Sequence, residues 1–207
     1  MKQEVKDFER IDLFNHYNSK YNPFIFLTTK VDITNIYNKC KNHYASIGYF
    51  ITLAANKIDN FKYRNENGKI YKYDILKSNF TIMFEESQDI WFFTCEPKDN
   101  YNDFIKEFKS KKDELFNNHR LDTYTDDGEL WFSCTPWYNF SSLITPFDKS
   151  VTIPQFLWDK FSFESDRCYI NLMIMAHHGF VDGYHIKLFL DEFNKIVENI
   201  DDYLKEN

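Results

Sequence analysis

Three of the six histidines in this chain lie close together, at positions 177, 178 and 185. The first two belong to the pattern His177-His178-x-x-x-Asp182-Gly183. The pKa of a histidine side chain is ordinarily about 6.5, so an imidazole here can take a proton from a hydroxyl group and return it at neutral pH. The spacing therefore indicates proton-transfer chemistry, with one of these histidines as a general base.

The flanking residues predict how this stretch is positioned. Before it, the apolar run at 168–174 is typical of a buried strand. After it, apolar residues recur every three or four positions, which predicts one helix running to about Leu204. Two of only five glycines, Gly179 and Gly183, lie between them, each expected where φ is positive or another segment comes close. We therefore expect the histidines at a tight strand-to-helix corner, from which one can reach a cleft.

The rest of the chain mixes helical patterns with short β-rich runs. Apolar spacing predicts helices over roughly 33–40, 45–58 and 103–118, and strands over 24–29, 61–64, 70–74, 80–85 and 90–95, with a turn at Gly68 and a turn-rich break at 123–128. There is no internal repeat, low-complexity tract or linker. We therefore expect residues 1–207 to form a single α/β domain, with a mixed, largely antiparallel sheet and helices on one face.

The composition excludes several classes of protein. Hydrophobic residues make up 43% of the chain and aromatic residues 19%, which supports a sizeable core. A net charge of −7 argues against binding to nucleic acid or to an anionic membrane. The four cysteines are widely spaced, without the spacing of a zinc site, so no metal is expected. Residues 1–6 lack an apolar signal segment and no run is long enough to span a membrane, which predicts a reduced cytoplasmic protein.

Three stretches carry a resemblance to a known family. HHxxxDG at 177–183 resembles the signature of the chloramphenicol acetyltransferases, although dihydrolipoyl acyltransferase cores and peptide-synthetase condensation domains share it. The start Phe8-x-Arg10-x-x-x-Phe14 resembles the aromatic-x-Arg-x-x-x-Phe of these acetyltransferases. Residues 133–140, with Ser-x-x-Pro-Trp-x-x-Phe, resemble their Ser-Ala-Leu-Pro-Trp-x-x-Phe. The resemblance covers about residues 8–200 and implies a two-layer α/β sandwich and a homotrimer with active sites at subunit interfaces.

The resemblance also implies roles for individual residues. His178, the second histidine of the pair, would be the general base that lets a hydroxyl of chloramphenicol attack the thioester of acetyl-coenzyme A directly. Ser133 would donate a hydrogen bond to the oxyanion that forms. Asp182 would make a buried ion pair with Arg10 that fixes the loop, and Tyr17 would contact the acceptor from the neighbouring subunit.

Two further residues would contact the cofactor, and two histidines have no predicted chemical role. Trp137 would line the cofactor channel, and Lys160 matches a lysine near the cofactor phosphate. His177 and His185 are expected to be structural.

Three positions depart from the family pattern. Phe84 stands where the family has a histidine, and Leu157 where it has a threonine that holds an ordered water. A cofactor-contact lysine of the family falls near Ser46. These departures leave open an alternative, an acetyl-coenzyme A-dependent acetyltransferase with another small-molecule acceptor. A trimeric binder without turnover is disfavoured, because both His178 and Ser133 are present.

Overall fold

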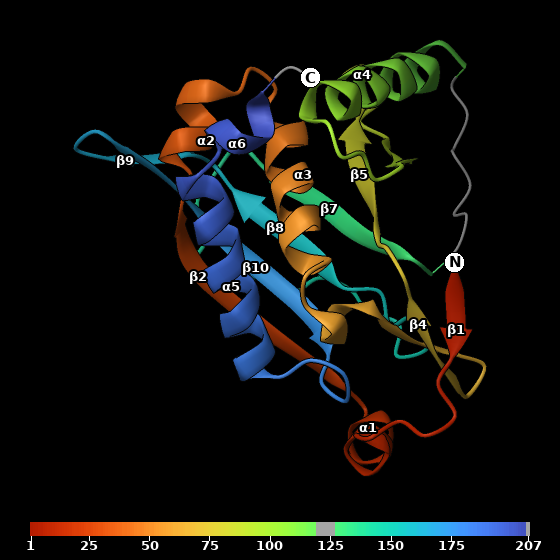
Figure 1. Cartoon of the computed structure of the whole chain (residues 1–207). Helices are drawn as coiled ribbons and strands as arrows, with labels where there is room; N and C mark the ends of the chain where they lie inside the picture. The colour runs from red at the N-terminus through yellow and green to blue at the C-terminus, as the bar shows by residue number, and fades with distance from the viewer. Residues whose placement is uncertain (119–126, 206–207) are drawn as a thin grey trace.

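The structure, a computed structural model, describes residues 1–118 and 127–205, so most of the break predicted at 123–128 lies outside the described residues. Its centre is a seven-stranded sheet in the order β2-β10-β8-β7-β5-β6, with β9 paired to β10 (Figure 1). The strands are β2 (Phe24–Asp32), β5 (Lys77–Met83), β6 (Ile90–Cys95), β7 (Glu129–Thr135), β8 (Gln155–Asp159), β9 (Ser162–Glu164) and β10 (Arg167–His177).

The sheet is mixed, and most of its pairs are antiparallel. Strand β7 runs parallel to β5 and to β8, while β10 is antiparallel to β2, β8 and β9, and β5 is antiparallel to β6. The predicted α/β class with a mixed, largely antiparallel sheet is therefore confirmed.

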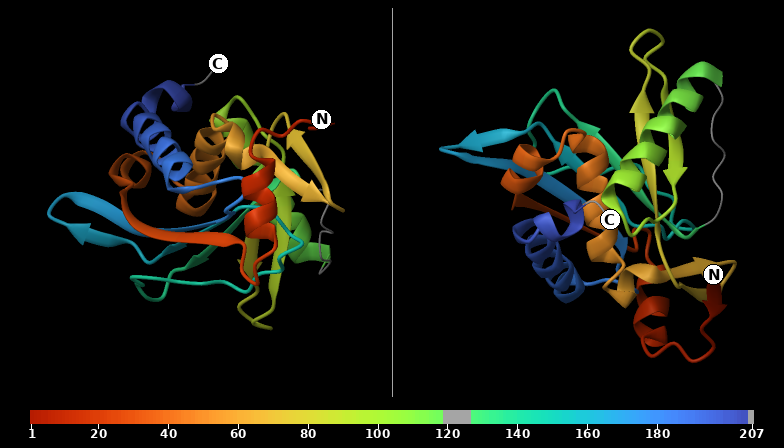
Figure 2. Two further views of the ribbon diagram at one scale, coloured as in Figure 1. Left: turned by 90° about the horizontal axis from the view of Figure 1, so that it is seen from below. Right: turned by 45° about the horizontal axis from the view of Figure 1, so that its top comes forward.

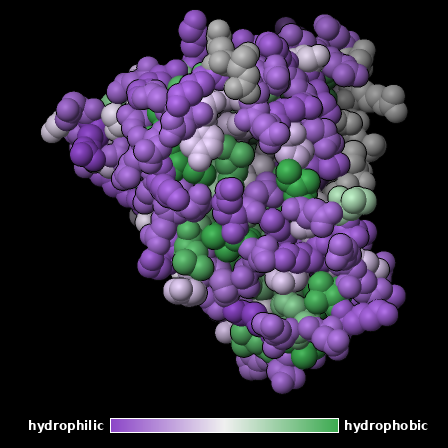
Figure 3. All heavy atoms as spheres, viewed as in Figure 1, coloured by the Kyte–Doolittle hydropathy of each residue, from purple (hydrophilic) through white to green (hydrophobic). Residues whose placement is uncertain are grey.

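Helices cover one face of this sheet, as the two views of Figure 2 show. They are α2 (Thr34–Lys39), α3 (His43–Ala55), α4 (Tyr101–Asn118), α5 (Gly183–Glu198) and α6 (Asp201–Leu204). The main core lies between the two layers. There Phe156 of β8 packs against Phe189 of α5 with ring centroids 5.3 Å apart, and Phe80 of β5 packs against Phe108 of α4 at 4.9 Å. The outer surface of this layer is largely hydrophilic, with scattered hydrophobic areas (Figure 3). Among the described residues no helix is both long and apolar enough to cross a membrane.

A small second sheet in the order β1-β4-β3 closes one end of the molecule. It consists of β1 (Lys2–Glu4), β4 (Lys69–Tyr73) and β3 (Tyr63–Glu66), and β3 directly follows the 3₁₀ helix η1 (Asp59–Lys62). Asn67 and Gly68 both have positive φ, which gives the predicted turn between β3 and β4. The buried Arg64 guanidinium donates hydrogen bonds to backbone carbonyls of η1, β3, Asp127 and Glu129, and so ties this sheet to the main one.

Several predicted boundaries are wrong. The final helix breaks after Glu198, and a separate short helix, α6, follows it. The strand expected at 61–64 begins only at Tyr63, because Phe61 and Lys62 complete η1. Gly183 has neither a positive φ nor any atom within 4 Å of where a Cβ would stand, so the backbone does not require glycine there.

The face of the sheet without these helices holds a second, smaller core. Phe24, Leu157, Met173 and Met175 form it, and the loop at 136–154 packs onto it through Phe140, Leu143 and Phe147. Side chains alternate between the two faces along each strand. Leu157 and Met173 therefore share this face with their registered neighbour Ser133 of β7.

Candidate active site

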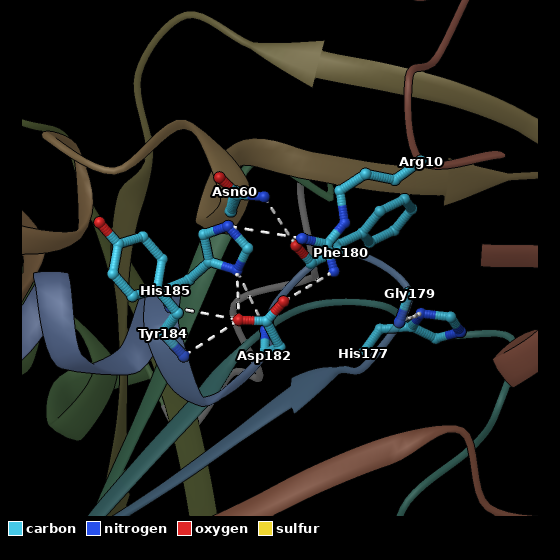
Figure 4. Close-up of polar contacts among 8 residues, drawn as sticks. All are labelled: Arg10, Asn60, His177, Gly179, Phe180, Asp182, Tyr184 and His185. Carbon is cyan, nitrogen blue, oxygen red and sulfur yellow. Dashed lines mark hydrogen bonds and ion pairs between the residues drawn. The ribbon is translucent and has the colours of Figure 1, made fainter. Parts of the chain in front are cut away.

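The predicted corner lies between the end of β10 at His177 and the start of α5 at Gly183. Asp182 is the N-cap of α5, and its Oδ1 accepts hydrogen bonds from the backbone N–H groups of Tyr184 (3.0 Å) and His185 (3.4 Å). The Asn60 side chain donates to the carbonyl of Phe180 at 2.8 Å, which ties the corner to η1 (Figure 4). The corner is therefore fixed both by the cap of α5 and by the hydrogen bond from η1.

The three histidines of the corner have different environments. His177 is buried, and its Nδ1 accepts from the backbone N–H of Gly179 at 3.1 Å. Burial and the neighbouring His178 lower the pKa of His177 to about 4, so it is neutral at pH 7. Nδ1 of His185 accepts from the backbone N–H of Asp182 at 3.2 Å, and burial lowers the pKa of His185 as well.

His178 differs from both because its imidazole is not used in holding the backbone. The side chain is half-buried, and its backbone N–H donates to the carbonyl of Pro23 at 2.8 Å. Its Nδ1 has no partner among the described residues. Nε2 of His177 also lacks a partner in the described chain, but His178 is the histidine of this corner whose ring makes no hydrogen bond to the backbone of the corner.

Arg10 and Asp182 are in contact, as Figure 4 shows, with 3.0 Å between Arg10 Nη2 and Asp182 Oδ2. Burial would raise the pKa of Asp182, but the hydrogen bond from Arg10 and the neighbouring His185 outweigh it and hold the pKa below its ordinary value. The side chains are 24% and 31% exposed, so the pair is only partly buried, not buried as expected. Its support of the catalytic site stays a prediction.

Tyr17 lies on helix α1 (Ile11–Asn18), and its ring stacks on the imidazole of His178, with centroids 4.1 Å apart and planes 13° apart. Within one chain Tyr17 thus lies against His178, and its expected contact with the acceptor from a neighbouring subunit stays a prediction. Helix α1 is anchored at the corner of its own chain. Phe14 of α1 stacks on Phe180 at 4.9 Å, and a Cβ on Gly179 would stand 2.6 Å from the Cα of Phe14.

Ser133 lies elsewhere, on the wall of a cavity of about 560 Å³ on the sheet face without helices. Strands β5 to β8 and the 136–154 loop form this cavity, which is lined by Asn79, Thr81, Phe92, Trp131, Phe132, Ser133, Thr145, Val151, Gln155, Phe156 and Leu157. His178 is not among these described residues. Sequence reasoning did not single out Thr145, Gln155 or Asn79, because single polar residues in a loop and in strands carry no motif.

Trp137 and Lys160 lie together just beyond Ser133, at the carboxyl ends of the parallel strands β7 and β8. The Lys160 backbone N–H donates to the carbonyl of Tyr138 at 3.3 Å, and Trp137 is 60% exposed. The buried carboxylate of Asp159 fixes this end by accepting from Asn139 Nδ2 (3.1 Å) and from the Phe140 N–H (3.2 Å). The position of both side chains leaves them open to a ligand, and their cofactor contacts stay predictions.

The three departures from the family pattern lie in different surroundings. Ser46 is fully buried on α3, where its hydroxyl is 2.7 Å from that of Tyr101. Leu157 lines the Ser133 cavity. Phe84 is buried against Phe116, with ring centroids 4.4 Å apart, and is not among the residues lining the cavity.

The predicted site residues therefore form two groups in one chain. Two strand steps separate Ser133 from Met173, through Leu157, and five residues then separate Met173 from His178. With about 4.8 Å per strand step and about 3.3 Å per residue, the Cα atoms of Ser133 and His178 lie about 19 Å apart. These two residues of one chain cannot touch the same reacting atom.

Neither metal ligation nor a cysteine nucleophile is indicated. Among the described residues no group of three or more histidine, cysteine, aspartate or glutamate side chains could hold a metal ion. Burial raises the pKa of Cys134 to about 11, so its thiol stays protonated at neutral pH.

Comparisons with known proteins identify the same family as the sequence resemblance. A family model described as chloramphenicol acetyltransferase matches residues 2–194. A chloramphenicol acetyltransferase from Clostridium perfringens is 27% identical over 203 residues, which cover 96% of this chain and 98% of that protein. Chloramphenicol acetyltransferase 3 from Escherichia coli is 23% identical over 207 residues, covering 94% of this chain and 95% of its own.

Solved structures agree at the level of the fold. A chloramphenicol acetyltransferase superposes with a TM-score of 0.78 at 22% identity, covering 99% of this chain and 100% of the other. A probable dihydrolipoamide acetyltransferase from Listeria monocytogenes superposes with a TM-score of 0.66 at 13% identity, covering 96% and 95%. At these identities the likenesses show the two-layer fold alone.

Proposed function

Because this chain belongs to the chloramphenicol acetyltransferase family, whose members are acyltransferases, we propose that it transfers the acetyl group of acetyl-coenzyme A to a hydroxyl of chloramphenicol. His178 takes the proton of that hydroxyl as general base, and the oxygen attacks the thioester carbonyl. Ser133 donates a hydrogen bond to the tetrahedral oxyanion. When the carbon–sulfur bond breaks, the coenzyme A thiolate recovers the proton from His178, and the O-acetyl ester leaves. No acyl-enzyme is formed.

The availability of the His178 imidazole is the observation that carries the proposal. His177 and His185 each accept a hydrogen bond at Nδ1 from a backbone N–H group of the corner. The Nδ1 of His178 has no such partner in the described chain, and Tyr17 stacks on the ring and restricts its rotation. A base that is held in orientation and not engaged with the backbone is what proton transfer to a bound substrate requires.

We further propose that the active site forms between copies of this chain in a homotrimer. One copy supplies His178, with Tyr17 on the ring and the Arg10–Asp182 pair beneath the corner. Its neighbour supplies Ser133 and the cavity beside it. The separation of about 19 Å within one chain supports this arrangement, because both groups must reach the same carbonyl.

Acetyl-coenzyme A would enter at the Trp137 and Lys160 end of the Ser133 group. The exposed indole of Trp137 offers a surface to the pantetheine arm, and the ammonium of Lys160 offers a charge to a phosphate. Both residues lie just after the carboxyl ends of β7 and β8, and Ser133 lies near the same end, four residues before Trp137. The thioester can then be drawn towards Ser133.

Release of coenzyme A, followed with a thiol reagent with and without chloramphenicol, tests this function directly. We expect release that depends on chloramphenicol and a loss of about 10²–10⁴ in kcat for His178→Ala. His16→Gln is a matched control, because His16 is an exposed histidine of α1 and should keep wild-type turnover. Robust turnover by folded His178→Ala would rule out the proposed base.

A different acceptor is the alternative that one observation favours. Leu157 brings an apolar side chain to the cavity wall beside Ser133, so the cavity could accommodate an acceptor other than chloramphenicol. A screen of alcohols and amines by coenzyme A release separates the two functions. Turnover of another acceptor, with none of chloramphenicol, would favour this alternative.

A further inference from the structure

A fully buried carboxylate lies next to the cavity that contains Ser133. Glu129 is on β7, two residues before Trp131 and four before Ser133, so the three side chains share one face of the strand. Glutamate is rarely buried completely unless it is hydrogen-bonded. Here the carboxylate accepts from the hydroxyl of Thr94 at 2.6 Å and from the indole Nε1–H of Trp131 at 3.2 Å.

This carboxylate sets the direction of a chain of hydrogen bonds. The Thr94 hydroxyl donates its single hydrogen to Oε1 of Glu129. The hydroxyl oxygen of Thr94 can then only accept from Asn79, whose Nδ2 lies 3.0 Å away. The carbonyl Oδ1 of Asn79 is left over, and no hydrogen bond between described residues uses it. Glu129 thus fixes which end of the Asn79 amide is free.

Asn79 and Trp131 belong to one row of side chains across the sheet. Asn79 is registered with Thr94 on one side and with Trp131 on the other, and Trp131 is registered with Gln155 of β8. Asn79, Trp131 and Gln155, the polar row, all line the Ser133 cavity. Gln155 Oε1 accepts from the Thr145 hydroxyl at 2.9 Å, which leaves its N–H groups free to donate. The row thus offers an acceptor, an indole ring and a donor.

We propose that the polar row recognises the acetyl acceptor and that Glu129 is its positioning residue. The ligand chemistry is a neutral molecule with a flat apolar group against Trp131, an O–H or N–H donated to Asn79 Oδ1, and an oxygen that accepts from Gln155. This assignment rests on the proposed function, because the cavity beside Ser133 is taken as the acceptor site. Glu129 touches no substrate and acts through Trp131, Thr94 and Asn79.

Thr94→Val tests the assignment because Thr94 does not line the cavity. The substitution keeps the shape of the side chain and removes the hydroxyl that orients Asn79. One net hydrogen bond corresponds to about a three- to tenfold change in affinity. We expect the Kd and KM for chloramphenicol to rise by that factor, while the KM for acetyl-coenzyme A and kcat stay unchanged. Thr94→Ser keeps the hydroxyl and should restore most of the lost affinity.

Thr52→Val is the matched control. Thr52 is also a buried threonine, and its hydroxyl bonds the carbonyl of Gly48 and the hydroxyl of Ser78, away from the cavity. It should lower the melting temperature as Thr94→Val does and leave chloramphenicol binding unchanged. An unchanged Kd in Thr94→Val, or an equal rise in Thr52→Val, would overturn the role of the polar row.

Substrate analogues separate this inference from the proposed function. Chloramphenicol carries a secondary hydroxyl and an amide N–H, so two analogues are needed, each lacking one of these donors. The analogue that lacks the donor bound by Asn79 Oδ1 should have the same Kd for wild-type protein and for Thr94→Val. If both analogues still bind Thr94→Val more weakly than wild-type protein, the contact with Asn79 is wrong although the enzyme acetylates the drug. If the wild-type protein neither binds nor acetylates chloramphenicol, the proposed function and this inference both fail.

Discussion

Mixing two inactive variants tests whether the active site is shared between copies. His178→Ala removes the proposed base, at a cost of about 10²–10⁴ in rate. Ser133→Ala removes the oxyanion donor, at a cost of about 10²–10³. Because about 19 Å separates the two residues within one chain, each variant still carries one intact half of the site. In a mixed oligomer, the His178 of a Ser133→Ala copy can then lie next to the Ser133 of a His178→Ala copy.

The expected recovery follows from the geometry. In a closed ring each site takes His178 from one copy and Ser133 from the next. Equal amounts of the two variants, assembled at random, place both intact residues together in about a quarter of the sites. Purification on two different tags after coexpression removes the trimers made of one variant only, and each remaining mixed trimer has one such site in three. We therefore expect the purified mixed oligomers to show about a third of wild-type coenzyme A release. Each variant alone should show about 1% or less.

One control makes the result decisive. Mixing His178→Ala with the double variant His178→Ala/Ser133→Ala supplies no intact base, so it should recover nothing. Light scattering on each preparation confirms that assembly is intact. Recovery no greater than the summed activity of the separate variants, from correctly assembled mixtures, would refute the sharing of the site.

Three further substitutions at the corner have defined outcomes. Asp182→Asn keeps the N-cap but loses the ion pair with Arg10, and should lower the free energy of unfolding in urea by about 1–2 kcal/mol, since the pair is partly exposed. Gly179→Ala should lower the melting temperature and activity, because its Cβ would meet the backbone of Phe14, whereas Gly183→Ala should do neither; equal stability of the two would contradict the close approach. Burial lowers the pKa of His177 to about 4 against 6.5 when unfolded, so the unfolded state binds the extra proton between these values. Stability should therefore fall by up to about 3 kcal/mol as pH drops from 6.5 to 4, and His177→Asn should flatten that slope in urea titrations.

The corner could be predicted from the sequence because its periodicity changes there. The run at 168–174 reads as a continuous apolar strand, and the spacing after Gly183 changes to three and four residues. The observed β10 and α5 follow that change. The end of the helix could not be predicted, since Ile200 and Leu204 continue the apolar stripe through the break after Glu198. The apolar stripe indicates only which side chains face the core. The side chains of α6 that continue the stripe face the same core, so the pattern does not reveal the break.

Contacts between distant segments were harder to predict. The contact of Arg10 with Asp182 was expected only because of the family resemblance, since 172 positions separate the two residues. The placement of Tyr17 on His178 of the same chain depends on how α1 docks, which the local sequence does not specify. Glu129 was missed because an acidic residue before an apolar strand is usually exposed. Only the register of β5, β6 and β7 shows that Thr94 and Trp131 surround it.

The same device recurs at three places that matter for the proposed chemistry. Asp182 fixes the corner that carries His178, Asp159 fixes the loop that carries Trp137, and Glu129 fixes the polar row beside Ser133. Each carboxylate accepts several hydrogen bonds from rigid neighbours, so the groups around it are oriented before any ligand arrives. If two copies bring these two halves together, each half is already formed in its own chain. Assembly then has to supply only the relative placement of His178 and Ser133, and the chemistry can begin without rearranging either half.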